Sequence, residues 1–373
     1  MNDYDVRRCR REDYGEFLDV MNEAFGHCAE FEWFQRNVGN CTPYPEQASD
    51  DLIDKHVIAV DRASGEIMGG VGVYPFDLIV SEDAPGGERF VLPIIGVGQV
   101  CCARKFRNRG VMSATLTRAL EDAAADGAVA GFLGGDTYRY GHFGFEYGGG
   151  ELRLDFRLSR LRTVTDILKL KTRAAGVPDI GELNGMYETL PSYIKRGAGY
   201  WKMLLGRKKF IWRVGELDGK KAYIAYGENY ARVLEICGDP DAAAALLAWH
   251  METRSLDRAT AMLPLAPGLG DPLAASLRKA SSYAQAAPAN MDLAAVFSVD
   301  KIYETLKPAI ERMRAAPRNN AEKAELVRYL ISAPGHPVPD FLNGRACGGD
   351  DATASTGCRA RPLVVWMSEA DSV

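Results

Sequence analysis

Apolar residues recur at two spacings along the first third of the chain, and these spacings predict an alternation of strands and helices. Every-second-residue alternation is typical of a half-buried strand, and recurrence at three and four residues is typical of an amphipathic helix. Strands are expected over 5–9, 56–60, 67–74, 90–92, 96–102 and 128–133, and helices over 11–25, 30–38 and 111–126. The turn-forming residues 61–65 predict that the second and third strands form a hairpin.

The rest of the chain predicts two further units. The second contains a strand over 152–156, a helical stretch over 192–205, a hairpin of 210–214 and 222–226, a strand over 233–236 and a helix over 241–251. Its order loosely repeats the first unit, without an arginine-rich loop ahead of the helix. The third has a strand over 293–297, a helix over 299–314, a polar loop over 344–357 and a strand over 361–366.

Composition limits the class of protein. The chain has 373 residues, enough for two or three domains, and 47% apolar with 25% charged residues is usual for a soluble globular protein. The 45 basic against 50 acidic residues argue against a dedicated nucleic-acid binder. No apolar run approaches the roughly 18 residues of a membrane span, and the first residues lack a signal-peptide core. We therefore expect a cytoplasmic protein with no nucleic-acid or membrane partner.

The eight cysteines and five histidines show no metal-ligand spacing. Only Cys101 and Cys102 are adjacent, and neighbouring residues of a strand point to opposite faces. The cysteines are best interpreted as small buried side chains in a reducing cytosol. No metal is expected.

The loop between the strand at 96–102 and the next helix is a candidate anion site. The first turn of a helix has free backbone N–H groups and the positive end of the helix dipole. Gly110 lets the backbone approach a ligand closely, and Arg107 and Arg109 add fork-like donors for phosphate oxygens. A solvated turn is the alternative on spacing alone.

The element Arg107-x-x-Gly110-x-Met112 resembles the Arg/Gln-x-x-Gly-x-Gly/Ala signature of GNAT-superfamily acetyltransferases, with Met112 in place of the usual small residue. It is most similar to the Eis-like (enhanced intracellular survival) branch. There a Leu-Pro…Gly strand precedes the loop, as at 92–96, and a Tyr-Gly-x-Phe-Gly-Phe/Tyr element follows, as at 140–145. The similarity is sharp over 92–148 and only architectural elsewhere.

The resemblance implies an α+β, mixed α/β architecture of tandem GNAT folds followed by a sterol-carrier-protein-like C-terminal domain. The expected boundaries are 1–150 for the domain with the acetyl-CoA site, 151–288 for a degenerate second domain and 289–373 for the C-terminal domain. A homo-oligomer, typically a hexamer in this branch, is also implied. Acetyl-CoA would be the co-substrate.

Carried over by position, the resemblance places the pantetheine arm along a strand, the pyrophosphate at the loop and the next strand end beside the cofactor. The implied cofactor-binding residues are Val100, Cys101, Cys102, Arg107, Asn108, Arg109, Gly110, Val111, Met112, Ser113, Gly135 and Asp136. An amine would attack the thioester directly, without a cysteinyl intermediate. The Val100 or Cys101 backbone N–H would stabilise the oxyanion.

Tyr140 matches the family's general acid, which protonates the departing thiolate. Tyr138 is a competitor, and a merely packed Tyr140 beside Phe143 and Phe145 is the plainer alternative. His142 is a candidate base only by proximity. The resemblance implies instead that the C-terminal carboxylate, here of Val373, accepts the amine proton, although chain ends usually fray.

Aromatic residues interleaved with glutamates near the N-terminus correspond to the family's amine pocket. They are Phe25, Phe31, Trp33 and Phe34 with Glu23, Glu30 and Glu32, and Trp33 is the candidate substrate-binding residue. Ordinary core and solvated face is the alternative interpretation. A polyamine, an aminoglycoside-like compound or a lysine side chain would fit a cation site. The expected function is an acetyl-CoA-dependent N-acetyltransferase; a catalytically silent acyl-CoA-binding regulatory protein and an acyltransferase using a longer acyl-CoA remain open.

Overall fold

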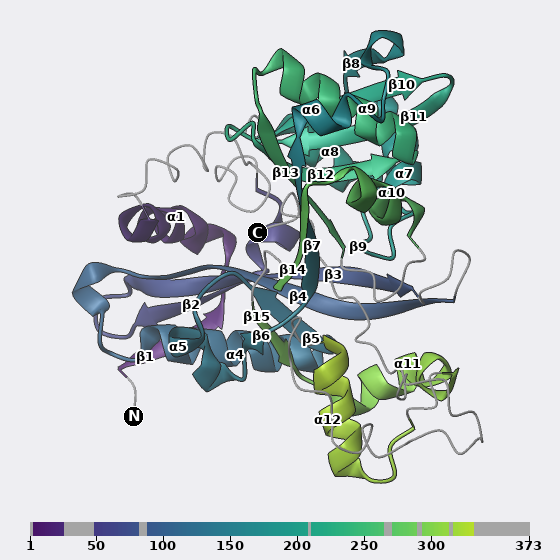
Figure 1. The fold of residues 1–373 in the computed structure, drawn as a ribbon. Coiled ribbons are helices and arrows are strands. Elements are labelled where there is room, and N and C mark those ends of the chain that lie inside the picture. Colours follow the sequence, from purple (N-terminus) through teal and green to yellow (C-terminus); the bar gives the residue numbers. More distant parts are fainter. Residues whose placement is uncertain are drawn as a thin grey trace.

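The computed structural model contains two β-sheets with helices packed on them (Figure 1). It describes residues 3–25, 48–81, 88–207, 210–264, 271–288, 293–312 and 316–331. The mixed α/β fold predicted from the sequence is confirmed. No helix within these ranges is long and apolar enough to cross a bilayer.

The first sheet has eight strands. In order they are β1 (Tyr4–Arg8), β2 (His56–Asp61), β3 (Ile67–Ser81), β4 (Arg89–Cys102), β5 (Ala130–Leu133), β15 (Leu293–Val296) and β6 (Glu146–Tyr147), with β9 (Ser192–Ile194) paired to β3. Among the described strands of this sheet β4 and β5 run parallel, and the other pairs are antiparallel.

Helices α1 (Arg11–Phe25) and α4 (Val111–Ala125) cover opposite faces of this sheet (Figure 1). Phe17 and Met21 of α1 pack with Met68 of β3, and Leu116 and Ala119 of α4 pack on the other face. These contacts follow from the helical spacing of apolar residues, which lets each helix bury one stripe. Short elements complete the unit: α3 (Asp50–Ile53), η1 (Arg104–Phe106), α5 (Thr137–Tyr140) and η2 (Gly141–Phe143).

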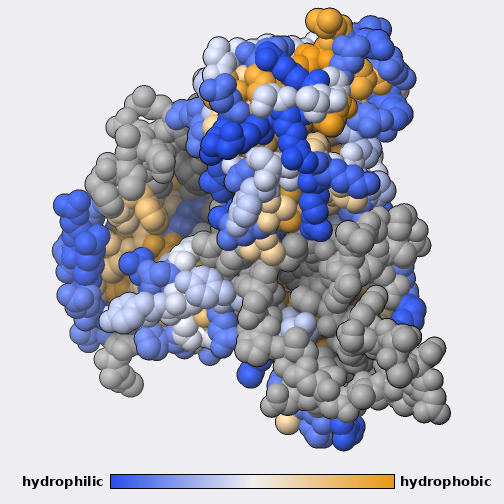
Figure 2. All heavy atoms as spheres, viewed as in Figure 1, coloured by the Kyte–Doolittle hydropathy of each residue, from blue (hydrophilic) through white to orange (hydrophobic). Residues whose placement is uncertain are grey.

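The second sheet has seven strands. In order they are β14 (Tyr283–Pro288), β7 (Gly150–Arg157), β13 (Arg258–Pro264), β12 (Arg232–Gly238), β11 (Lys220–Tyr226), β10 (Ile211–Leu217) and β8 (Lys171–Ala174). Around it lie α6 (Leu158–Leu161), η3 (Ile167–Lys169), η4 (Val177–Asp179), α7 (Ile180–Tyr187), α8 (Ala198–Gly206), α9 (Pro240–Thr253) and α10 (Pro272–Ala280). Figure 2 shows apolar side chains at the tip of this unit.

The two units share an order of elements. In the first, β2, β3 and β4 are antiparallel, α4 follows, and β5 pairs parallel to β4; in the second, β10, β11, β12, α9 and β13 do the same. The start of α9 differs, because the Asp239 carboxylate accepts the N–H groups of Asp241 and Ala242. An acidic cap occupies the position where an anion would bind. The domain boundaries at 150 and 288 stay predictions.

Two expectations need correction. The stretch 192–205 is helical only from Ala198; its first three residues form β9 and pair with β3 at 78–80. The strand at 293–296 lies in the first sheet, between β5 and β6, and not in a separate third unit. Helices α11 (Val299–Arg312) and α12 (Asn320–Ile331) pack on that sheet as well. Such short strands are placed by distant partners, which local spacing does not encode.

Candidate functional site

Strands β4 and β5 part from each other inside the first sheet. They pair at only three positions, from Ile94 with Ala130 to Gly96 with Phe132. Strand β4 continues beyond the last pair to Cys102. Along this stretch its backbone N–H and C=O groups on the β5 side have no strand partner among the described residues. An extended ligand can bind these groups.

Strand β4 is also irregular beyond that point. Gly70 pairs with Cys101 and Gly72 with Gly98, so β4 has one residue more than β3 between the two pairs. The irregularity falls at Gln99, whose φ of +50° is left-handed. This conformation costs a non-glycine residue about 1–2 kcal/mol, so the surrounding structure must hold it. A bulge of this kind redirects the peptide groups that follow.

The loop after β4 ends in a helix start without a side-chain cap. Asn108 and Gly110 have φ values of +64° and +75°, and no side chain caps the first turn of α4, which also holds no acidic residue. The N–H groups of 111–113 therefore have no partner within the helix. Among the described residues only the Tyr4 hydroxyl lies within 4 Å of a Cβ placed on Gly110, so the left-handed φ, not crowding, favours glycine. The helix start is open to an anion.

The two arginines of this loop differ in their contacts. Arg109 lies 3.4 Å from the Asp61 carboxylate and its guanidinium stands over the Phe106 ring. Arg107 is exposed and makes no ion pair within the described residues. Burial raises the pKa of the Cys102 thiol, and the Arg107 guanidinium partly opposes this. Arg107 is therefore the cation better placed to contact an anion there.

The Cys101 thiol is expected to resist alkylation in the folded protein. It is buried, and burial raises its pKa to about 12, so almost no thiolate is present near neutral pH. Peptide mapping after iodoacetamide treatment should find Cys101 unmodified in the native protein and modified in urea. Rapid modification of the native form would contradict this and reopen a nucleophilic role for the residue.

Tyr140 and Tyr138 occupy different environments. Tyr138 is 91% exposed, whereas Tyr140 is buried with its ring T-shaped to Phe145 at 6.4 Å. A Cβ on Gly135 would lie 2.5 Å from the Tyr140 ring, so this glycine permits the contact. Asp136 caps α5, the helix that carries Tyr140. Burial raises the pKa of Tyr140 and keeps its phenol protonated.

The remaining predicted residues divide into two groups. His142 is exposed in η2, Glu23 accepts the Arg104 backbone N–H at 2.9 Å, and Phe25 packs in the core cluster on the α1 face. Phe25 thus follows the core interpretation. The residues Phe31, Trp33, Phe34, Glu30, Glu32 and Val373 lie outside the described residues, and their roles stay predictions. In the described part no group of three or more His, Cys, Asp or Glu could hold a metal.

Sequence reasoning missed the residues that support the bulge. Gln99 accepts a hydrogen bond from the Tyr74 hydroxyl, and both side chains are buried. No local sequence pattern predicts the Tyr74–Gln99 pair, because a bulge depends on the register of two strands. The only signal is the density of glycines in β3 and β4, which indicates close approach.

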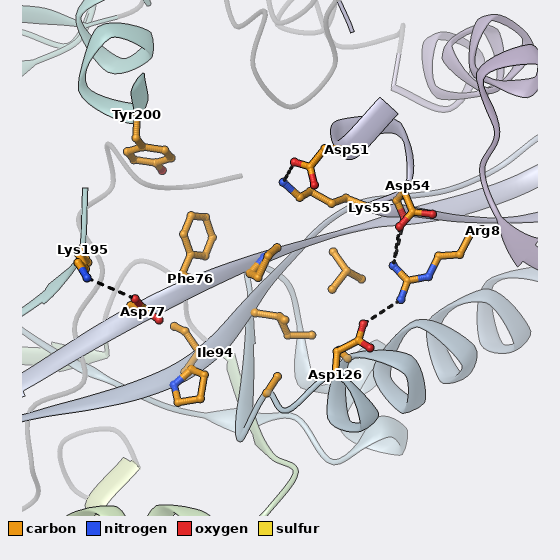
Figure 3. Close-up of a pocket in the computed structure, with 16 residues that line it drawn as sticks. Arg8, Asp51, Asp54, Lys55, Phe76, Asp77, Ile94, Asp126, Lys195 and Tyr200 are labelled. Carbon is orange, nitrogen blue, oxygen red and sulfur yellow. Dashed lines mark hydrogen bonds and ion pairs between the residues drawn. The ribbon is translucent and has the colours of Figure 1, made fainter. Parts of the chain in front are cut away.

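A cavity of about 560 Å³ opens at the other end of α4, along the edge of β3 between β2 and β9 (Figure 3). Pro75 has no N–H to offer there, which is typical of an unpaired strand edge. The charged side chains that line the cavity form ion pairs with one another: Arg8 with Asp126, Lys55 with Asp51 and Lys195 with Asp77. None of the predicted site residues lines this cavity. It is therefore distinct from the start of α4.

Comparison with known proteins covers the first unit most directly. Residues 5–148 match the family model described as an acetyltransferase (GNAT) domain. A Streptomyces avermitilis protein named an uncharacterized N-acetyltransferase is 28% identical over 164 residues, 42% of this chain and 35% of that protein. The chain thus matches about a third of the length of this relative.

Solved structures resemble most of the chain. A probable N-acyltransferase from Enterococcus faecalis V583 has a TM-score of 0.59 at 15% identity, and Eis1 from Mycobacterium abscessus has 0.54 at 16%; each match covers 81% of this chain and 75% of the other. At these identities the likeness shows a shared fold. Residues 5–148 therefore match a GNAT acetyltransferase domain, and the chain shares its fold with these solved structures, Eis1 among them.

Proposed function

We propose that this chain is an acetyl-CoA-dependent N-acetyltransferase that transfers an acetyl group to a primary amine. The observation that carries the proposal is the uncapped start of α4, which follows the stretch of β4 that has parted from β5. Pyrophosphate oxygens suit free N–H groups at the positive end of a helix. The amides of a pantetheine arm suit the unpaired backbone of β4.

The proposed reaction is direct attack of the amine nitrogen on the thioester carbonyl. The new C–N bond forms, the C–S bond breaks, the amine gives up a proton and the leaving thiolate takes one. The backbone N–H of Val100 or Cys101, just after the bulge, would stabilise the oxyanion. The Tyr140 phenol, kept protonated by burial, would supply the proton to sulfur.

Calorimetry with acetyl-CoA tests the binding half of the proposal. Arg107→Gln should weaken binding by about 10- to 100-fold, because it removes charge-assisted hydrogen bonds to phosphate. Arg118→Gln is the matched control, since Arg118 lies within the helix that follows the loop and pairs with Asp122 at 2.7 Å. A wild-type protein that does not bind acetyl-CoA would refute the proposal. Equal binding by Arg107→Gln would refute only the phosphate contact.

Turnover assays test the chemical half. The amine panel should hold a polyamine, an aminoglycoside and a lysine peptide, each with acetyl-CoA and with a longer acyl-CoA. Acetylation of one of these amines is the expected result. Binding without turnover across the panel would favour a silent acyl-CoA-binding protein, and turnover with the longer donor alone would favour a different acyltransferase. The homo-oligomer stays a prediction that sedimentation velocity checks.

A further inference from the structure

A chain of buried polar groups crosses the first sheet and ends at the bulge of β4. The His56 ring, at the start of β2, has Nδ1 3.2 Å from the Ile53 carbonyl and Nε2 3.0 Å from the Tyr74 hydroxyl. The Tyr74 hydroxyl donates to Gln99 Oε1 at 2.6 Å. The three side chains are 0%, 5% and 9% exposed. Polar groups buried this completely are stable only when hydrogen-bonded, so the contacts constrain one another.

The last member of this hydrogen-bonded series is Gln99, the residue with the strained backbone. Gln99 has its φ at +50°, and the peptide that joins it to Val100 carries the N–H directed by the bulge. Fixing the Gln99 side chain therefore fixes the direction of that N–H. Without the bond from Tyr74 the residue is free to return toward an ordinary strand conformation, which rotates the peptide.

Strand β3 is shaped to accommodate the contact. A Cβ on Gly72 would lie 2.4 Å from Gln99 Oε1 and 2.6 Å from the Tyr74 hydroxyl, closer than non-bonded atoms approach. Only glycine leaves room for both groups at this position. Three neighbouring strands supply the four residues that meet at this hydrogen bond, His56, Tyr74, Gly72 and Gln99.

We propose that Tyr74, held by His56, is a positioning residue for the acyl-transfer step. It acts through Gln99 and sets the Gln99–Val100 peptide toward the thioester carbonyl. This inference rests on the proposed function. The nucleotide end of the donor would bind at the start of α4, on the far side of the Arg-rich loop, so losing the Tyr74 hydroxyl should affect the acyl-transfer step far more than the affinity for acetyl-CoA.

Tyr74→Phe removes the hydroxyl and keeps the ring. It should lower kcat by about 10- to 100-fold, as expected for a misdirected oxyanion donor, with a much smaller change in the KM and calorimetric Kd for acetyl-CoA. Tyr193→Phe is the matched control, because Tyr193 is also a buried β-strand tyrosine whose hydroxyl is hydrogen-bonded, to Arg89 at 3.2 Å. Its kcat should stay at the wild-type value.

A double-mutant cycle separates positioning from general damage. Gln99→Met removes the acceptor at similar length, and the double variant Tyr74→Phe/Gln99→Met should be no slower than the slower single variant, because both break one bond. Wild-type kcat in Tyr74→Phe, fully multiplicative losses, or a matching loss of acetyl-CoA affinity would each overturn the inference. If Tyr74→Phe lowers Tm strongly, the test uses Gln99→Met alone. That variant should then lower kcat without a matching loss of affinity for acetyl-CoA. Failure of the wild type to bind acetyl-CoA would refute the proposed function instead.

Discussion

Replacing Tyr140 with phenylalanine is expected to lower kcat by about 10²- to 10⁴-fold, the range for loss of a general acid. The side chain is buried against Phe145, so the ring will keep its place when the hydroxyl is removed. Binding of acetyl-CoA should be unchanged, because the residue acts on the leaving sulfur. Steady-state kinetics and calorimetry on the same preparation measure the two quantities.

Tyr138→Phe is the control for that experiment. The substitution is identical and the residue lies on the same short helix, but its side chain is 91% exposed. We expect wild-type kcat. A loss in Tyr138→Phe with none in Tyr140→Phe would reverse the assignment of the acid, and no loss in either would exclude a tyrosine acid from α5.

The pH dependence gives a second test of the same residue. Burial raises the pKa of Tyr140 above its usual value of about 10, and the acid must be protonated to act. The activity that depends on this proton is therefore complete at neutral pH and is lost only as the pH rises through the raised pKa. A pH profile of kcat should show no decline from this group below about pH 10. A tyrosine-dependent decline near pH 8 would contradict the assignment.

The start of α4 was predictable because every signal for it is local. The strand alternation up to Cys102, the loop with Arg107 and Gly110, the apolar stripe of the helix and Gly127 at its end are adjacent in sequence. The structure places α4 at Val111–Ala125, as the spacing indicated. Local interactions of this kind decide a helix end without help from distant residues.

The bulge at Gln99 and the pairing of β9 and β15 with strands of the first sheet could not be predicted in this way. A bulge is a mismatch between two strands, and Gln99 read alone is an ordinary polar strand residue. Strand β9 has three residues and β15 has four, too few for spacing to indicate a partner. Their positions depend on which sheet edge is available after the rest has folded, which is non-local information.

The buried ion pair between Arg196 and Glu235 could not be predicted from local sequence patterns either. Charged side chains are usually exposed, yet those of Arg196 and Glu235 are fully buried and joined by two hydrogen bonds of 2.9 and 2.7 Å. The Tyr223 hydroxyl donates to the same carboxylate at 2.6 Å, and the Arg196 guanidinium stands 3.7 Å from the centre of the Tyr187 ring. The partners are 39 residues apart, so no helical or strand spacing relates them.

Glu235→Gln is expected to destabilise the second unit by about 3–5 kcal/mol, because it leaves the Arg196 charge buried without its counter-charge. Urea unfolding followed by tryptophan fluorescence measures this, since Trp201 and Trp212 lie in the same aromatic cluster. Glu182→Gln is the control: Glu182 pairs with Lys221 at the surface, and its loss should cost less than about 1 kcal/mol.

The same pair links the two sheets. Arg196 follows β9, which pairs with β3 of the first sheet, whereas Glu235 lies in β12 of the second. In Glu235→Gln the amides of β9 should therefore exchange faster with deuterium, while those of β2 keep wild-type protection. Replacing both partners with apolar residues, as in Arg196→Met/Glu235→Leu, should recover most of the lost stability, because no charge then stays buried. A double variant as unstable as Glu235→Gln would mean that the hydrogen bonds of the pair, and not its uncompensated charge, hold β9 against the second sheet.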